Sequence, residues 1–202
     1  MGIEIPQNKF LILDGAMGTV LQQRGLSPQG RPELLNLTEP ELLNSVYKEY
    51  IAAGSQVIYA NTFGANGLKL AKTGHSVEEV VGAAIAVAKK AAAGTGTLVA
   101  LDVGPLGELL EPMGTLSFER AYALFREMAE AGAKAGADLI VVETMTDLYE
   151  AKAALLAAKE AAHLPVFVTM SFDAGGRTFT GCTVASMART LEGLGADAIG
   201  LD

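Results

Sequence analysis

The sequence predicts an α/β fold built from repeated strand–helix units. Short apolar runs of strand length alternate with longer Ala-rich segments of helical period. The apolar runs are nearly continuous in Val, Ile and Leu, as in parallel strands that are buried on both faces. Parallel strands joined by helices form an open doubly wound sheet or a (β/α)8 barrel. The loop after the first expected strand, Asp14-Gly-Ala-Met-Gly-Thr19, lacks the G-x-G-x-x-G phosphate fingerprint, which favours the barrel.

Six strands and five helices are expected. The strands are Phe10–Leu13, Gln56–Ala60, Thr97–Leu101, Asp138–Val142, Val166–Met170 and Ala198–Leu201. The helices are Glu39–Ala53, Val77–Ala92, Ser117–Ala135, Asp147–Ala162 and Val184–Leu194. Ser76 and Ser117 are predicted N-caps, and Gly54, Gly136 and Gly195 stand where a left-handed C-cap is needed. Because a (β/α)8 barrel usually takes about 250 residues, residues 1–202 are expected to form the N-terminal part of one, with about six βα units.

Composition excludes several classes of protein. Lys and Arg total 15 against 23 Asp and Glu, a formal net charge of −8 without a basic cluster, so nucleic acid is not an expected partner. No apolar run approaches the roughly 20 residues that cross a bilayer, and no export signal precedes the first strand, so we expect a cytoplasmic protein without membrane contact. The single cysteine, Cys182, excludes a disulfide framework and a zinc site built from several cysteines of this chain.

Polar and acidic residues follow the predicted strands, where the active sites of both architectures lie. They are Asp14, Asn61 to Phe63, Asp102, Glu143, Ser171, Asp173 and Asp202. Carboxylates gathered at the mouth of an apolar core indicate a positively charged ligand, either a cation or an ammonium group. Asp102 and Asp173, each taken alone, are more readily interpreted as caps of the following helix. No lysine ends a strand and no Ser–His pair is evident, which disfavours Schiff-base and triad chemistry.

The segment from Asp14 to Thr19 combines an acid with small residues that let a ligand approach the backbone. Its N–H groups could hold an anion while the Asp14 carboxylate holds a cation. An α-amino acid carries both charges. The alternative is a Gly-rich turn that serves geometry alone.

These residues also carry a resemblance to a known family. The chain resembles the homocysteine S-methyltransferase family, and within it the homocysteine-binding domain of cobalamin-dependent methionine synthases. The motifs that match are Leu13-Asp-Gly-Ala-Met-Gly-Thr19, Arg31-Pro-Glu-Leu-Leu-Asn36, Ala60-Asn-Thr-Phe-Gly-Ala65, Val103-Gly-Pro105, Leu139-Ile-Val-Val-Glu-Thr144, Asp147-Leu-Tyr-Glu-Ala-Lys152 and Gly195-Ala-Asp-Ala-Ile-Gly200.

The resemblance implies a (β/α)8 barrel that binds homocysteine at its C-terminal rim. It implies that Asp14 and Glu143 hold the ammonium group, and that backbone amides around Gly15, Ala16 and Met17 hold the carboxylate. It places Asn61, Thr62 and Phe63 along the pocket. The implied reaction transfers a methyl group from methylcobalamin to a zinc-bound homocysteine thiolate to give methionine, with cobalamin and folate domains elsewhere in the parent protein.

The sequence departs from the family pattern at the metal. The family takes three zinc cysteines from a Gly-x-Asn-Cys segment after the sixth strand and a Cys-Cys pair after the eighth, whereas this chain reads Gly200-Leu-Asp202 at its end. Cys182 matches no ligand position. We therefore expect a fragment with part of the amino-acid pocket, no zinc site and no catalysis of its own. The open strand edges of such a fragment also predict association or a partly molten state.

Three alternatives stay open at this point. The methyl donor could be betaine or S-methylmethionine. Asp14, Asp102 and Glu143 could hold Mg²⁺ in a carboxylate-site lyase. The chain could also be a binding module without catalysis.

Overall fold

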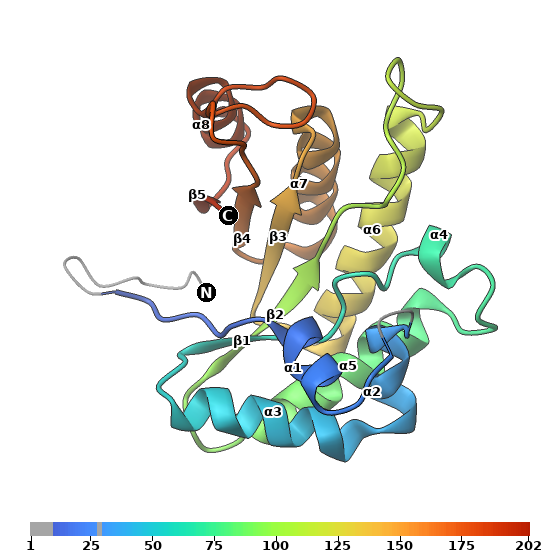
Figure 1. Ribbon diagram of the computed structural model, residues 1–202, viewed down its shortest axis with the longest axis vertical. Helices are drawn as coiled ribbons and strands as arrows, with labels where there is room; N and C mark the ends of the chain where they lie inside the picture. Colours follow the sequence, from blue (N-terminus) through green and yellow to red (C-terminus); the bar gives the residue numbers. More distant parts are fainter. Residues whose placement is uncertain (1–9, 28–29) are drawn as a thin grey trace.

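The computed structural model describes residues 10–27 and 30–202, which form one curved parallel sheet backed by helices (Figure 1). The strands are β1 (Val57–Tyr59), β2 (Leu98–Val103), β3 (Leu139–Met145), β4 (Val166–Met170) and β5 (Ala198–Leu201). They pair in sequence order, each parallel to the next. The helices are α1 (Met17–Gln23), α2 (Leu35–Thr38), α3 (Pro40–Ala52), α4 (Gly67–Leu70), α5 (Val77–Ala92), α6 (Phe118–Ala135), α7 (Leu148–Ala162) and α8 (Val184–Gly193), with a 3-10 turn, η1 (Pro32–Leu34).

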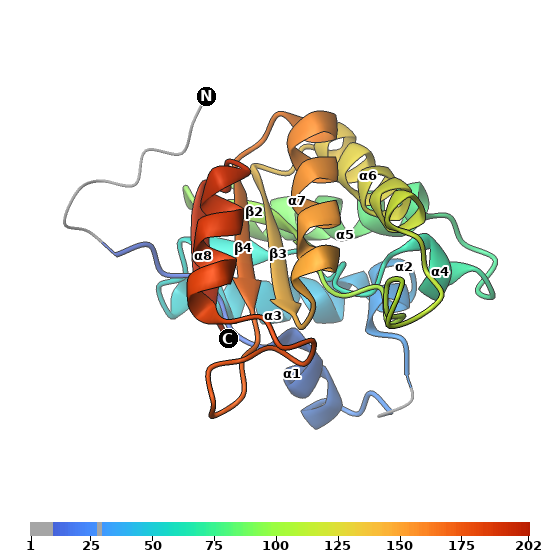
Figure 2. The ribbon, with the colours of Figure 1, turned by 90° about the horizontal axis from the view of Figure 1, so that it is seen from above.

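The long helices pack on one face of the sheet. Neighbours in the series α3, α5, α6, α7 and α8 contact one another, so the helical layer follows the strand order (Figures 1 and 2). Strand residues alternate between the two faces. In β3, Ile140 and Val142 belong to the large core under the helices, whereas Leu139 and Val141 belong to a smaller apolar cluster on the inner face. Both faces are buried there, as the continuous apolar runs predicted.

The long helices begin and end close to the predicted residues because their caps are encoded locally. The hydroxyls of Ser76 and Ser117 accept the backbone N–H groups of Glu79 and Arg120, three residues further on. The C-terminal glycines Gly54, Gly136 and Gly195 have φ values of +107°, +92° and +83°. These left-handed conformations stop the helices and turn the chain back toward the sheet.

The first predicted strand, Phe10–Leu13, is wrong as a strand. Leu13 forms only an isolated bridge with Val57. The carbonyl of Ile12 accepts the N–H groups of both Gln56 and Val57, and the Ile12 N–H goes to the Gln56 side chain rather than to a backbone carbonyl. Phe10 is 93% exposed. The segment therefore lies beside β1 without a regular ladder, because the Gln56 side chain takes the Ile12 N–H that a ladder bond would use.

A recurring hydrogen-bond pair joins each of three strands to the segment before it. Asp138, just before β3, donates its N–H to the Val99 carbonyl and accepts the Val99 N–H with its carboxylate (2.7 Å). Asp197, just before β5, makes the same two bonds with Val166. Gln56 makes them with Ile12 before β1. Each of these polar residues lies two positions after a helix-ending glycine, so the pair fixes where the next strand starts.

Two of these carboxylates also have a lysine partner. Lys89 of α5 contacts Asp138 at 2.7 Å, and Lys159 of α7 contacts Asp197 at 3.0 Å. The acids at the amino ends of the strands are thus neutralised within the chain. No helix in the described ranges is long and apolar enough to cross a membrane.

Candidate functional site

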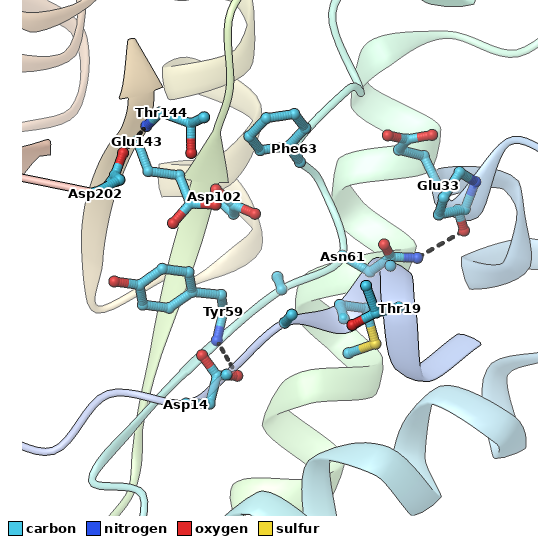
Figure 3. Close-up of a pocket in the computed structure, with 16 residues that line it drawn as sticks. Asp14, Thr19, Glu33, Tyr59, Asn61, Phe63, Asp102, Glu143, Thr144 and Asp202 are labelled. Carbon is cyan, nitrogen blue, oxygen red and sulfur yellow. Dashed lines mark hydrogen bonds between the residues drawn. The ribbon is translucent and has the colours of Figure 1, made fainter. Parts of the chain in front are cut away.

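A cavity of about 550 Å³ opens at the carboxyl ends of the strands (Figure 3). Its lining comes from the segment before α1 and the first turn of that helix, from η1, from the ends of β1, β2 and β3, from the residues just after β1, and from Asp202 after β5. The lining residues are Asp14, Gly15, Ala16, Met17, Gly18, Thr19, Pro32, Glu33, Tyr59, Ala60, Asn61, Phe63, Asp102, Glu143, Thr144 and Asp202. Seven of the eight residues predicted to bind substrate are among them, and Thr62 is not.

Asp14 lies between the first segment and α1. Its Oδ2 accepts the Tyr59 N–H at 2.9 Å, which fixes the side chain against the end of β1. Its Oδ1 is buried and has no hydrogen-bond partner in the described part of the chain. Burial, reinforced by the charge of Glu143, raises the pKa of Asp14 to about 7. The carboxylate is therefore held in place with one oxygen free for a ligand.

Glu143 is the second predicted acid, and it lies within β3. Burial, reinforced by the charge of Asp202, raises its pKa to about 7. Thr144 follows with a φ of +58°, a left-handed conformation that non-glycine residues rarely adopt. In this conformation the Thr144 N–H donates to Asp202 at 2.7 Å, so Asp202 lies at the same edge of the sheet as the end of β3 that bears Glu143.

Asp102 is a third acid in the cavity, and its interpretation as a helix cap is wrong. It is only 7% exposed, and its Oδ1 is buried without a donor among the described residues. Burial and the charges of Glu143 and Asp14 raise its pKa well above the usual range. Asp173, by contrast, accepts the N–H groups of Gly175 and Arg177 in a turn outside the cavity.

Thr62 holds β1 and β2 together beneath the cavity. Its side chain is fully buried, its hydroxyl donates to the Asp102 carbonyl at 2.7 Å, and its Oγ1 accepts the Asp102 N–H at 3.0 Å. A threonine side chain replaces the backbone ladder at this point. Thr62 therefore positions Asp102.

Asn61 and Phe63 flank Thr62 and face the cavity. The Asn61 side chain donates to the Pro32 carbonyl at 2.6 Å, and its N–H donates to the buried Tyr47 hydroxyl. Phe63 packs against Gly104, where a Cβ would come within 2.4 Å of the ring. Only glycine allows this close approach, and the ring closes one side of the cavity.

The loop from Gly15 to Met17 passes over Tyr50. The Tyr50 hydroxyl donates to the Ala16 carbonyl at 3.0 Å, and α1 begins at Met17 without a side-chain N-cap. Its first N–H groups are thus not taken by a cap.

Glu33, on η1, also lines the cavity, and the sequence prediction missed it. Its Oε1 accepts the Gly64 N–H at 2.8 Å. The sequence signal that could have pointed to Glu33 is the Arg31-Pro-Glu-Leu-Leu-Asn36 motif, which contains it.

Electrostatically, the cavity is acidic throughout. Its described lining contains five carboxyl groups and no Lys, Arg or His. The carboxyl groups that line the cavity therefore have no cationic partner in its described lining, whereas Asp138 and Asp197 at the other end of the sheet are paired with lysines. The arrangement can bind a cationic group and disfavours an anion beside the carboxylates.

The described residues do not provide a metal site. Among residues 10–27 and 30–202, no group of three His, Cys, Asp or Glu side chains is arranged to hold a metal ion. Cys182 lies in a different depression, beside Met113 and Tyr149. Its Sγ donates to the Thr183 carbonyl, and burial raises the pKa of the thiol.

Known proteins resemble the chain over nearly its whole length. Methionine synthase of Mycobacterium tuberculosis is 30% identical over 220 residues, which cover 99% of this chain and 18% of that protein. The methionine synthase of Mycobacterium leprae matches to the same extent. The chain thus spans less than a fifth of the curated relatives it matches.

Solved structures agree with the sequence matches. The metallated form of the homocysteine methyltransferase MmuM from Escherichia coli superimposes with a TM-score of 0.84 at 25% identity, over 96% of this chain and 75% of that one. These structural relatives confirm the predicted α/β barrel class, with a barrel that is not closed within the described residues. The family described as homocysteine S-methyltransferase matches residues 11–202. The chain belongs to the homocysteine S-methyltransferase family.

Proposed function

We propose that the cavity binds homocysteine for methylation of its thiol, with the α-ammonium group between Asp14 and Glu143. The observation that carries this proposal is the lack of any cation in the described lining of a cavity that buries several carboxyl groups. A buried carboxylate without a partner is costly, and an ammonium group offsets this cost with charge and N–H donors. The family membership supports homocysteine as the amino acid.

The remaining parts of the predicted pocket would orient the substrate. Backbone N–H groups around Ala16 and Met17 would bind the α-carboxylate, as the resemblance implies. Asn61 and Phe63, held by the contacts described above, would line the part of the cavity that receives the substrate's side chain. In the reaction, the sulfur forms a bond to the methyl carbon as the bond between that carbon and the donor breaks, and the thiol proton is lost.

We further propose that the parent protein is of the methionine synthase type and takes the methyl group from methylcobalamin. The sequence motifs and the methionine synthase relatives support this choice. Zinc and the cobalamin and folate domains are expected outside these 202 residues, and the chain alone is expected to lack turnover. A cytoplasmic location, where thiols stay reduced, fits a thiol substrate.

Calorimetric titration of the 202-residue chain with L-homocysteine tests the binding site. Asp14→Asn and Glu143→Gln are each expected to weaken binding at least tenfold, because each removes one charge from a desolvated ion pair. Asp173→Asn is the matched control, since it removes a carboxylate outside the cavity and keeps a side-chain oxygen for the turn.

The same titration with 4-mercaptobutyrate, which lacks only the ammonium group, is expected to give no measurable heat of binding. Equal affinity for the two thiols would show that the carboxylates do not bind the ammonium group.

A methyl-transfer assay tests the donor. The 202-residue chain is expected to give no methionine with methylcobalamin, betaine or S-methylmethionine, whereas the longer parent protein should use methylcobalamin. Turnover by the 202-residue chain would contradict the proposal that it is inactive alone.

A further inference from the structure

The position of Asp102 in β2 does not require a carboxyl side chain. Its backbone N–H and carbonyl are both satisfied by Thr62, so the main chain would be held equally well with another side chain. Its carboxyl group is more than nine-tenths buried, lies on the cavity and leaves Oδ1 without a donor. A buried acceptor left without a donor destabilises the folded state. A ligand that donates a hydrogen bond would remove this cost.

No cationic side chain in the described lining of the cavity donates a hydrogen bond to Asp102. The carboxyls of Glu143, Asp14 and Glu33 lie close enough to act on its pKa, and the phenols of Tyr47 and Tyr59 respond to its charge. Figure 3 shows Asp102 and Glu143 on the same side of the cavity, opposite the loop that bears Asp14. A ligand that enters the cavity with N–H groups supplies the missing donor.

Three carboxyl groups have open acceptor positions on the cavity. Asp14 Oδ1 and Asp102 Oδ1 are unpartnered. Glu143 is directed toward the same space and is half-buried (Figure 3). A primary ammonium group carries three N–H bonds that diverge tetrahedrally, so its donors match these acceptors in number.

Building on the proposed function, we propose that Asp102 is the third acceptor for the substrate ammonium group and makes the site selective for a primary amine. One N–H would go to each of Asp14, Glu143 and Asp102. A methyl group on the nitrogen would remove one donor and place an apolar group against a carboxyl oxygen. Sites built to hydrogen-bond a polar group reject analogues that leave the site's own groups unpaired.

The test compares L-homocysteine with N-methyl-L-homocysteine in calorimetric titrations of the 202-residue chain under reducing conditions. The unsubstituted chain is expected to bind homocysteine at least tenfold more tightly. In Asp102→Ala the ratio should fall to about two or less, because affinity for homocysteine drops while the methyl group gains room. Asp102→Asn keeps an oxygen acceptor of the same size and should retain most of the preference. A purely structural role would lower both affinities together.

The outcomes separate the two proposals. No binding of homocysteine, or full binding by Asp14→Asn and Glu143→Gln, would refute the proposed function itself. Homocysteine binding that those two variants weaken, together with an unchanged ratio in Asp102→Ala, would overturn only the role of Asp102. A ratio near one in the unsubstituted chain would overturn it as well, and this measurement needs no variant to fold. Circular dichroism checks that Asp102→Ala retains its helices.

Discussion

Asp14 should make the unliganded protein less stable as pH rises. Its pKa is about 7 in the folded chain against an ordinary value of 3.8, so between these values the folded state holds a proton that the unfolded state has lost. Stability falls with rising pH wherever the unfolded state binds fewer protons. Asp14→Asn removes this titration and should flatten the dependence.

The magnitude follows from the width of that window. Each pH unit well inside it is worth about 1.36 kcal/mol and the slope halves at the folded pKa, so the unsubstituted chain should lose about 2 kcal/mol between pH 5 and pH 7 through Asp14. Above the folded pKa the loss is complete, and further change up to pH 8 is small. Any constant effect of the amide cancels, because each protein is compared with itself at different pH.

Urea unfolding followed by far-UV circular dichroism is the suitable assay, since the chain has no tryptophan. Free energies of unfolding would be measured at pH 5, 6, 7 and 8 for the unsubstituted chain, for Asp14→Asn and for Glu108→Gln. Glu108 is an exposed carboxylate in the loop after β2, so its removal should leave the pH profile unchanged. Parallel profiles for the unsubstituted chain and Asp14→Asn would refute the argument that burial perturbs this carboxyl group.

Three further predictions concern helix packing, buried hydrogen bonds and backbone conformation. Gly132→Ala should destabilise the chain by about 1–3 kcal/mol, because the added Cβ would come within 2.7 Å of the Leu101 side chain of β2. At Gly82 an added Cβ meets nothing within 4 Å, so Gly82→Ala should stabilise α5 by up to about 1 kcal/mol. Equal effects of the two substitutions in urea unfolding would contradict this contrast. Thr62→Val should cost about 2–3 kcal/mol because two buried hydrogen bonds are lost, and Thr62→Ser should restore most of that, so a neutral valine variant would show that the bonds contribute nothing. His163→Gly should raise the melting temperature, because His163 ends α7 at a φ of +51°, and an unchanged or lower value would count against backbone strain there.

The sequence allowed the long helices to be predicted to within one or two residues because their signals are local. Ser117 and Gly136 mark the two ends of α6 by direct hydrogen bonding and by backbone conformation. The first segment failed as a strand for a non-local reason. Whether Phe10–Leu13 forms a ladder depends on how Ile12 pairs with Gln56, 44 residues further on, and periodicity contains no information about that pairing.

The site was predictable only in part for the same reason. Asp14 and Glu143 follow apolar runs within recognisable motifs, and the structure brings both to one cavity. Asp102 follows such a run too, but whether it caps a helix or faces the cavity depends on the neighbouring strands. Thr62 lies within a pocket motif and yet points between β1 and β2, a distinction that residue type alone does not make.

The hydrogen-bond pair before β1, β3 and β5 makes the junction between loop and strand a determinant of strand register. Gln56, Asp138 and Asp197 each stand directly before their strand, with no residue between. Inserting one residue between the paired residue and its strand would shift that strand by one position relative to the hydrogen-bond pair. Because strand side chains alternate with a period of two, Leu139 and Val141 would exchange faces with Ile140 and Val142. The same shift would turn Glu143 away from the cavity, so the direct junction of Asp138 with β3 at the far end of the sheet decides which side chains of that strand face the cavity.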